Sequence, residues 1–103
     1  MVEVAGELDM MTSPQLRDAL QRLLDDGTRN VVIDLAEVRF MDSTTLGVLV
    51  VTFRALRDRG GRLCLAAAQR SVRAMLAVTN VDQAIVVYDT VEAAEASMPP
   101  VVA

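Results

Sequence analysis

Three short apolar runs stand out in the pattern of hydrophobic and polar positions along the chain. They read Val-Val-Ile-Asp-Leu at 31–35, Leu-Cys-Leu-Ala at 63–66 and Ile-Val-Val-Tyr at 85–88. Each run has the length of a β-strand, and near-continuous apolar character is typical of strands that are covered on both faces. Residues 2–9 predict one further strand, with a kink at Gly6.

Apolar residues at helical spacing predict helices between these strands. The first runs from Pro14 to about Asp25, where leucines share one face and charged residues lie opposite. Ser13 is expected to be its N-cap residue, because a serine hydroxyl can accept from a free backbone N–H and a proline follows it. Gly27 is expected to end the helix in the left-handed conformation.

Residues 44–58 predict a second helix, which the glycine pair at 60–61 closes. It carries an apolar stripe and three further valines at 48, 50 and 51. We therefore expect most of the circumference of this helix to be covered by other parts of the protein. The stripe consists of Leu46, Leu49, Phe53 and Leu56.

Two shorter helices complete the pattern. One is expected after Asp89, whose side chain stands at capping-box spacing from Glu92. The other short helix is expected after Ser71, with Val72, Met75 and Leu76 directed inward. The alternation of strands and helices along the chain predicts an α/β fold with parallel neighbouring strands and right-handed crossovers.

The length of 103 residues fits a single domain. We expect that domain to span residues 1–98, followed by a flexible tail at 99–103. Hydrophobic residues make up 52% of the chain, which is enough to bury a core and argues against intrinsic disorder. Because aromatic residues make up only 3%, that core must be mostly aliphatic.

Composition argues against several classes of function. The net charge of −4 argues against a protein that binds nucleic acid directly, since such proteins carry a basic face. The chain contains no histidine, which excludes Ser-His-Asp catalysis and imidazole zinc sites. Every basic residue is arginine, which excludes a catalytic lysine. With neither a membrane span nor an N-terminal leader in the sequence, we expect a cytoplasmic protein.

The single cysteine, Cys64, cannot form a disulfide within the chain. It lies in an apolar run, so we expect a buried and unreactive thiol. Asp9 and Asp42 could in principle hold a metal ion as a pair of carboxylates. Two acidic residues at loop ends are far more often simply solvated, so we expect no metal site.

Residues 36–45 carry the candidate chemistry. Asp42, Ser43 and Thr44 stand where the second helix begins, and a hydroxyl there can serve simply as an N-cap. The same helix end also favours an anion, and a phosphate on Ser43 would add about −1.5 to −2 charges. Together with Asp42 and Asp9, that phosphate would make the surface strongly negative and repel a docked partner. Local pattern leaves both interpretations open.

Four stretches make the sequence similar to the STAS domain family, the anti-sigma factor antagonists. The Asp-Ser pair at 42–43, within this context, is the most specific feature. The resemblance extends over nearly the whole chain, from Val4 to about Ser97. The stretches are Gly-Glu-Leu-Asp at 6–9 with Thr-Ser-Pro at 12–14, Val-Ile-Asp-Leu at 32–35 with Phe-Met-Asp-Ser at 40–43, Leu-Gly-Val-Leu at 46–49, and the segment from Val72 to Ala93.

The resemblance implies the STAS fold, a small, mixed, largely parallel sheet of about four strands flanked by about four α-helices. It also implies a bacterial regulator that binds an anti-sigma factor serine kinase and so frees a sigma factor. That kinase would phosphorylate Ser43 with its own bound ATP and end the interaction, and a serine phosphatase would reset it. This chain itself would be no enzyme and would need no cofactor.

The resemblance further implies which residues contact the partner. The three methionines among them would supply adaptable apolar contact, although ordinary packing explains each equally well. The residues are Asp9, Met10, Met11, Thr12, Met41, Asp42, Ser43, Thr44 and Thr45.

Two features depart from the family pattern. Thr45 stands where the family usually has a small residue, and its β-branched side chain would stiffen the helix start and crowd the approach to Ser43. The strand that usually precedes the region of Gly6 is curtailed, which would leave an exposed sheet edge and favour pairing of two copies. Both features suit an alternative function, a non-phosphorylated structural STAS module of a multi-protein or transporter complex. A small hydrolase is the weakest candidate.

Overall fold

The computed structural model describes residues 2–4, 13–36 and 38–98. Within these residues four strands form one sheet in the order β1-β2-β3-β4, and every neighbouring pair is parallel. Because each strand is parallel to the strand before it in the sequence, the chain must cross back over the sheet between them, usually through a helix. The alternation of strands and helices in the sequence predicts these crossovers. The strands are β1 (Val2–Val4), β2 (Asn30–Asp34), β3 (Arg62–Ala66) and β4 (Val87–Tyr88).

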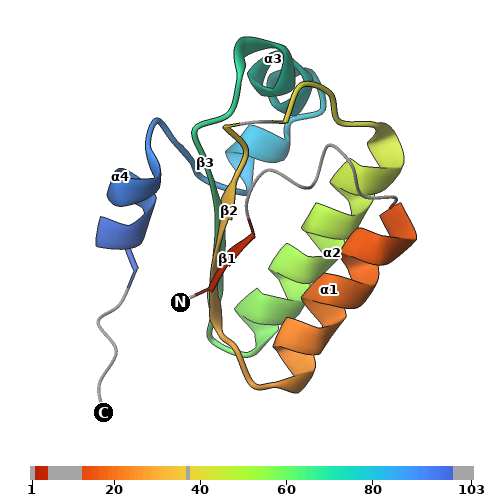
Figure 1. Ribbon diagram of the computed structural model, residues 1–103, viewed down its shortest axis with the longest axis vertical. Helices are drawn as coiled ribbons and strands as arrows, with labels where there is room; N and C mark the ends of the chain where they lie inside the picture. Colours follow the sequence, from red (N-terminus) through yellow and green to blue (C-terminus); the bar gives the residue numbers. More distant parts are fainter. Residues whose placement is uncertain (1, 5–12, 37, 99–103) are drawn as a thin grey trace.

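Helices cover both faces of this sheet (Figure 1). The helices α1 and α2 lie side by side on one face, and α4 lies on the other. The helix α3 sits beyond the end of the sheet toward which the strands point. This arrangement confirms the predicted α/β fold. The helices are α1 (Ser13–Asp25), α2 (Ser43–Asp58), α3 (Arg70–Val78) and α4 (Val91–Ala96), with a 3₁₀ turn, η2, at Val81–Gln83.

The core has two parts, one on each face of the sheet. Val31 and Ile33 of β2 belong to the larger part, beneath α1 and α2, whereas Val32 belongs to the smaller part beneath α4. Because successive side chains of a strand point to opposite faces, a strand buried on both faces is apolar throughout. The near-continuous apolar run at 31–35 thus has the burial that it predicted.

Cys64 lies in the smaller part of the core and is only 4% exposed. Burial raises the pKa of its thiol, although the nearby charge of Arg62 works in the opposite direction. Both the burial and the direction of the pKa agree with an unreactive cysteine.

The beginning of α1 differs from the sequence prediction. The helix begins at Ser13, so this serine is the first helical residue and not the N-cap before it. The end of the helix agrees with the prediction, since Gly27 has a φ of +80°. The N–H of Thr28 donates to the carbonyl oxygen of Leu23 at 3.0 Å, which satisfies one of the carbonyl groups left free at the helix end.

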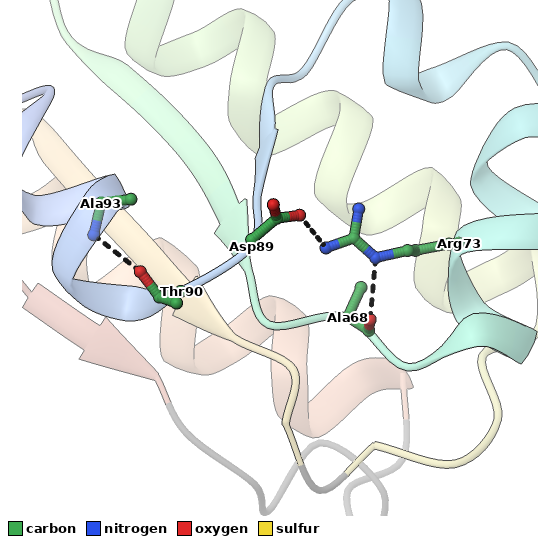
Figure 2. A network of polar contacts seen from close by, with 5 residues as sticks. All are labelled: Ala68, Arg73, Asp89, Thr90 and Ala93. Carbon is green, nitrogen blue, oxygen red and sulfur yellow. Dashed lines mark hydrogen bonds and ion pairs between the residues drawn. The ribbon is translucent and has the colours of Figure 1, made fainter.

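The cap of α4 differs from the prediction as well, and lies one residue later in the chain (Figure 2). The hydroxyl of Thr90, not the carboxylate of Asp89, accepts from the backbone N–H of Ala93 at 3.0 Å. Asp89 instead pairs with Arg73 of α3 at 3.0 Å. The same guanidinium donates to the carbonyl oxygen of Ala68, so Arg73 joins the segments that follow β3 and β4. With Thr90 as the cap, Glu92 is not at the capping-box position.

Two more expectations need correction. The run at 85–88 forms ladder pairs only at Val87–Tyr88, with Ile85 buried ahead of the strand. Val51 of α2 is 67% exposed, so the helix is less covered than its apolar sequence predicts. Among the described elements, α1 and β3 make the main contacts with α2, and they leave the side chain of Val51 exposed.

The third helix agrees with the sequence prediction apart from its first residue. It begins at Arg70, one residue before Ser71, and buries Val72 and Leu76 while Met75 is half-buried. The predicted strand is confirmed at residues 2–4, but its continuation to residue 9 and the predicted tail at 99–103 lie outside the described residues.

Candidate functional site

The loop between β2 and α2 carries the candidate site at the end of the sheet toward which the strands point. Leu35, Val38 and Met41 hold it from below, since these side chains are between 0% and 3% exposed. The backbone N–H of Leu35 donates to the carbonyl oxygen of Ala66 at 2.9 Å and so continues the pairing of β2 with β3. Between these buried positions, Ala36, Arg39 and Phe40 are exposed.

Polar contacts hold the same loop from the side. The amide of Gln69 donates to the carbonyl oxygen of Ala36 at 2.8 Å. The hydroxyl of Ser71, on α3, donates to the carbonyl oxygen of Arg39 at 3.0 Å. These contacts tie the loop to α3 and to the residue before it, so α2 begins from a fixed point.

The carboxylate of Asp42 caps helix α2. It accepts from the backbone N–H of Thr45 at 2.7 Å, and the backbone of Asp42 is extended, as expected at an N-cap. A hydroxyl was the expected cap from the sequence, so the structure corrects the identity of the capping group. An ionised carboxylate is the stronger acceptor at the positive end of a helix.

This capping geometry lowers the pKa of Asp42. The largest cause is the hydrogen bond from the backbone N–H of Thr45, followed by the hydrogen bond from the Thr45 hydroxyl, and the backbone N–H of Thr44 contributes less. Loss of solvation acts in the opposite direction and outweighs the contribution of the Thr44 N–H, but not those of Thr45. Asp42 is therefore ionised at neutral pH, and Thr45 is turned back toward it.

Ser43 is the first residue of α2, and it is exposed. Because Asp42 supplies the cap, the hydroxyl of Ser43 is not needed for that purpose. Within the described residues, no hydrogen bond engages this hydroxyl. Thr44, the next residue, is also exposed, whereas Thr45 is half-buried. An external enzyme can therefore reach the Ser43 oxygen.

The remaining predicted contact residues divide into two groups. Met41 is 3% exposed and packs in the core, so ordinary packing accounts for it and its side chain is not on the surface. The residues at 9–12 (Asp9, Met10, Met11 and Thr12) lie outside the described part of the chain.

Phe40 is a surface residue that the sequence prediction did not include. Its side chain is 72% exposed, next to the buried Met41 and three residues before Ser43. Aromatic side chains are costly to leave in water and are common anchors of protein interfaces. The available signal was its position after Arg39 in a loop, outside any helical or strand periodicity.

Among the described residues, no group of three or more His, Cys, Asp or Glu side chains is arranged to hold a metal ion. In the same part of the chain, none of the helices has both the length and the apolar character needed to cross a membrane. What the site does present is an exposed hydroxyl, a capping carboxylate and an exposed aromatic ring.

Comparison with known proteins finds a matching family model and relatives in sequence. The family model of the STAS domain matches residues 1–94. The anti-sigma-B factor antagonist of Staphylococcus aureus is 35% identical over 79 residues, which cover 77% of this chain and 73% of that protein. The protein of the same name from Staphylococcus epidermidis matches with the same identity and the same coverage.

Solved structures agree with the fold. The crystal structure of a Thermotoga maritima protein assigned as an anti-sigma factor antagonist has a TM-score of 0.75 at 26% identity, and the match covers 93% of this chain and 80% of that one. The structure of the Bacillus cell fate determinant SpoIIAA in its phosphorylated form has a TM-score of 0.64 at 18% identity. This match covers 93% of this chain and 83% of the SpoIIAA chain. The second likeness concerns the fold alone.

Proposed function

Because the chain belongs to the STAS domain family, we propose that it is an anti-sigma factor antagonist controlled by phosphorylation of Ser43. In its unphosphorylated form it binds an anti-sigma factor that is also a serine kinase, and the sigma factor held by that kinase is released. The role is regulatory rather than enzymatic, and we place it in the cytoplasm. The family membership and the names of the staphylococcal relatives support the anti-sigma factor as partner.

The proposed covalent step transfers one phosphoryl group to Ser43. The serine oxygen bonds to the γ-phosphorus of ATP bound by the partner, the bond from that phosphorus to the β,γ-bridging oxygen breaks, and ADP leaves. The hydroxyl proton passes to a base of the partner kinase, as in other protein kinases. Hydrolysis of the phosphoester by a serine phosphatase returns the hydroxyl and releases inorganic phosphate.

One observation carries this proposal: Ser43 is exposed at the first position of α2 while its neighbour Asp42 does the capping. Modification of Ser43 therefore leaves the Asp42 cap in place. The free backbone N–H groups and the dipole of the helix partly compensate the added negative charge. We accordingly expect the phosphorylated protein to keep its fold.

The change in charge acts on the partner instead. A phosphate on Ser43 stands beside the ionised Asp42 and makes a compact negative surface. A partner surface shaped for a neutral hydroxyl then loses its fit and meets repulsion. Phe40, exposed on the same loop, supplies the apolar contact that the buried Met41 does not.

The direct test incubates the protein with its cognate anti-sigma factor kinase and ATP, and measures the intact mass. We expect the mass to rise by one phosphate group, which peptide mapping places on Ser43. Ser43→Ala should abolish the gain, whereas Thr79→Ala, a change of an exposed hydroxyl at the end of α3, should leave it intact. An unchanged mass of the wild type, or equal labelling of Ser43→Ala, would reject the proposal.

The alternative function remains a structural STAS module of a multi-protein or transporter complex. The observation that favours it is the exposed apolar side of α2 at Val51, which suits a permanent subunit contact. Purification of the protein with its partners from its own cells separates the two functions. A histidine-kinase-like ATPase as partner supports the phosphorylation switch, and a transporter ATPase or scaffold supports the alternative.

A further inference from the structure

A groove runs along the outer side of the helix pair α1 and α2. Its volume is about 480 Å³, and its floor is mainly apolar. It starts at Thr44, directly after Ser43, and follows α2 to Ala55. At 1.5 Å per residue that is about 16 Å of helix. Val51, which is 67% exposed, lies at its rim, so the groove is an open apolar surface that begins beside the modification site.

Gly47 lines this groove in the interior of α2. Glycine weakens a helix interior relative to alanine, so its presence there calls for a reason. The fold does not supply one, because Gly47 is not among the glycines with positive φ and a Cβ added at this position would meet nothing within 4 Å. What Gly47 does provide is room for a second molecule to approach the helix backbone, one turn below Ser43.

The charges around the groove favour an acidic occupant. Arg17 is the one charged side chain among the described residues that line it, and it is exposed. In the described part of the chain no carboxylate forms an ion pair with Arg17. The neighbouring polar group on α1, the amide of Gln21, is already bonded to Asp25 at 3.0 Å. The groove therefore combines an apolar floor with one positive charge at its edge.

The contact area that a stable protein complex needs also favours a partner that docks at Ser43 and extends into the groove. A specific protein interface buries about 800 Å² on each partner. The exposed side chains at 40–44 are too few to supply that area, and the groove continues from them without interruption. A partner that docks at Ser43 can reach a sufficient area by extending along α2.

We infer that the α1–α2 groove is the second half of the docking surface for the anti-sigma factor that phosphorylates Ser43. Its occupant is an apolar segment of that partner, with an acidic side chain placed opposite Arg17 and its backbone close to Gly47. This inference rests on the proposed function, since it assigns the groove to the same partner. It adds a contact area that phosphorylation itself does not touch.

Calorimetry with the kinase that phosphorylates Ser43 tests the inference. Val51→Asp and Arg17→Glu should each weaken binding about 10- to 100-fold, by loss of apolar burial and by charge repulsion respectively. Val78→Asp on α3, where the valine is 83% exposed, and Arg22→Glu on α1, outside the groove, are the matched controls. Each control should change the affinity by no more than about twofold.

Gly47→Ala separates docking from folding. The added methyl group should raise the Tm of the free protein by about 2–8 °C, because alanine is the better helix former. It should also weaken kinase binding about 5- to 30-fold by blocking the close approach. A more stable protein with weaker binding cannot result from damage to the fold.

The outcomes distinguish this inference from the proposed function. If Ser43 is phosphorylated and all three groove variants bind the kinase like the wild type, the groove assignment is wrong and the function stands. If Ser43 is not phosphorylated by any cognate kinase, the proposed function fails and the kinase is not the occupant. A dimer in sedimentation that Val51→Asp dissociates, with kinase affinity unchanged, would assign the groove to a second copy of the chain and overturn the inference.

Discussion

Adjacent residues at the start of α2 have separate tasks. The Asp42 carboxylate caps the helix through the N–H of Thr45, and the Ser43 hydroxyl is left exposed. If Ser43 were the cap, its phosphorylation would disrupt the first turn of α2. With the cap on Asp42, the same modification changes only the charge of the surface.

The cap makes a testable prediction about stability. Asp42→Ala removes the acceptor for the Thr45 N–H and should lower the Tm by about 4–8 °C, whereas Asp42→Asn keeps an acceptor and should lower it less. Because the pKa of Asp42 is lowered in the folded protein, its charge stabilises the fold above the unfolded-state pKa of about 3.9. That stabilisation disappears as the pH falls through the lower, folded-state pKa.

Thermal unfolding followed by circular dichroism between pH 2 and pH 7 gives the measurement. The wild type should lose stability relative to Asp42→Asn as the pH falls below about 4. Parallel curves for the two proteins across the whole pH range would show that the carboxylate does not stabilise the helix start.

At the level of elements, the connection from α2 into β3 depends on a close backbone contact. The N–H of Gly61 donates to the carbonyl oxygen of Leu56 at 2.7 Å, and the N–H of Arg62 donates to the carbonyl oxygen of Arg29 at 2.8 Å. A Cβ at position 61 would lie 2.0 Å from that Arg29 oxygen. The chain can therefore turn from helix to strand at this point only without a side chain.

Gly61→Ala should accordingly destabilise the protein by about 3 kcal/mol or more, since a backbone atom cannot move aside cheaply. Urea unfolding of Gly61→Ala beside Gly47→Ala provides the comparison, because the same substitution at position 47 meets no atom within 4 Å. Equal free energies of unfolding for the two variants would contradict the close contact at Gly61.

At the level of the whole molecule, the spacing of apolar residues in the sequence predicts where the strands and helices lie. Strands buried on both faces of a parallel sheet appear as near-continuous apolar runs, and helices appear as apolar residues at helical spacing. The pattern did not distinguish which of two neighbouring polar residues caps a helix, as at Asp89 and Thr90. That choice depends on Arg73, sixteen residues away, which binds Asp89 and leaves the cap to Thr90. A tertiary contact of this kind leaves no local signal.

The same limit applies to the candidate site. The Asp-Ser pair at 42–43 identified the place, but only the structure distinguishes the buried Met41 from the exposed Phe40 beside it. Likewise the apolar sequence of α2 could not show that Val51 faces solvent, because that depends on which helices pack beside it. The sequence therefore predicts where the site lies, and the fold determines which of its side chains a partner can touch.

The whole molecule already carries a net charge of −4, and the proposed switch adds further negative charge at one exposed point. Repulsion of about 2–3 kcal/mol at that point corresponds to a roughly 30- to 150-fold loss of affinity. Part of this loss should disappear at high salt, because exposed charges are screened.

The most direct measurement compares the affinity of the anti-sigma factor for the unphosphorylated protein and for the protein phosphorylated at Ser43, by calorimetry at low salt. We expect the phosphorylated form to bind roughly 30- to 150-fold more weakly while its circular dichroism spectrum is unchanged, and Ser43→Asp to weaken binding in the same direction. Equal affinity of the two forms for the anti-sigma factor would contradict it.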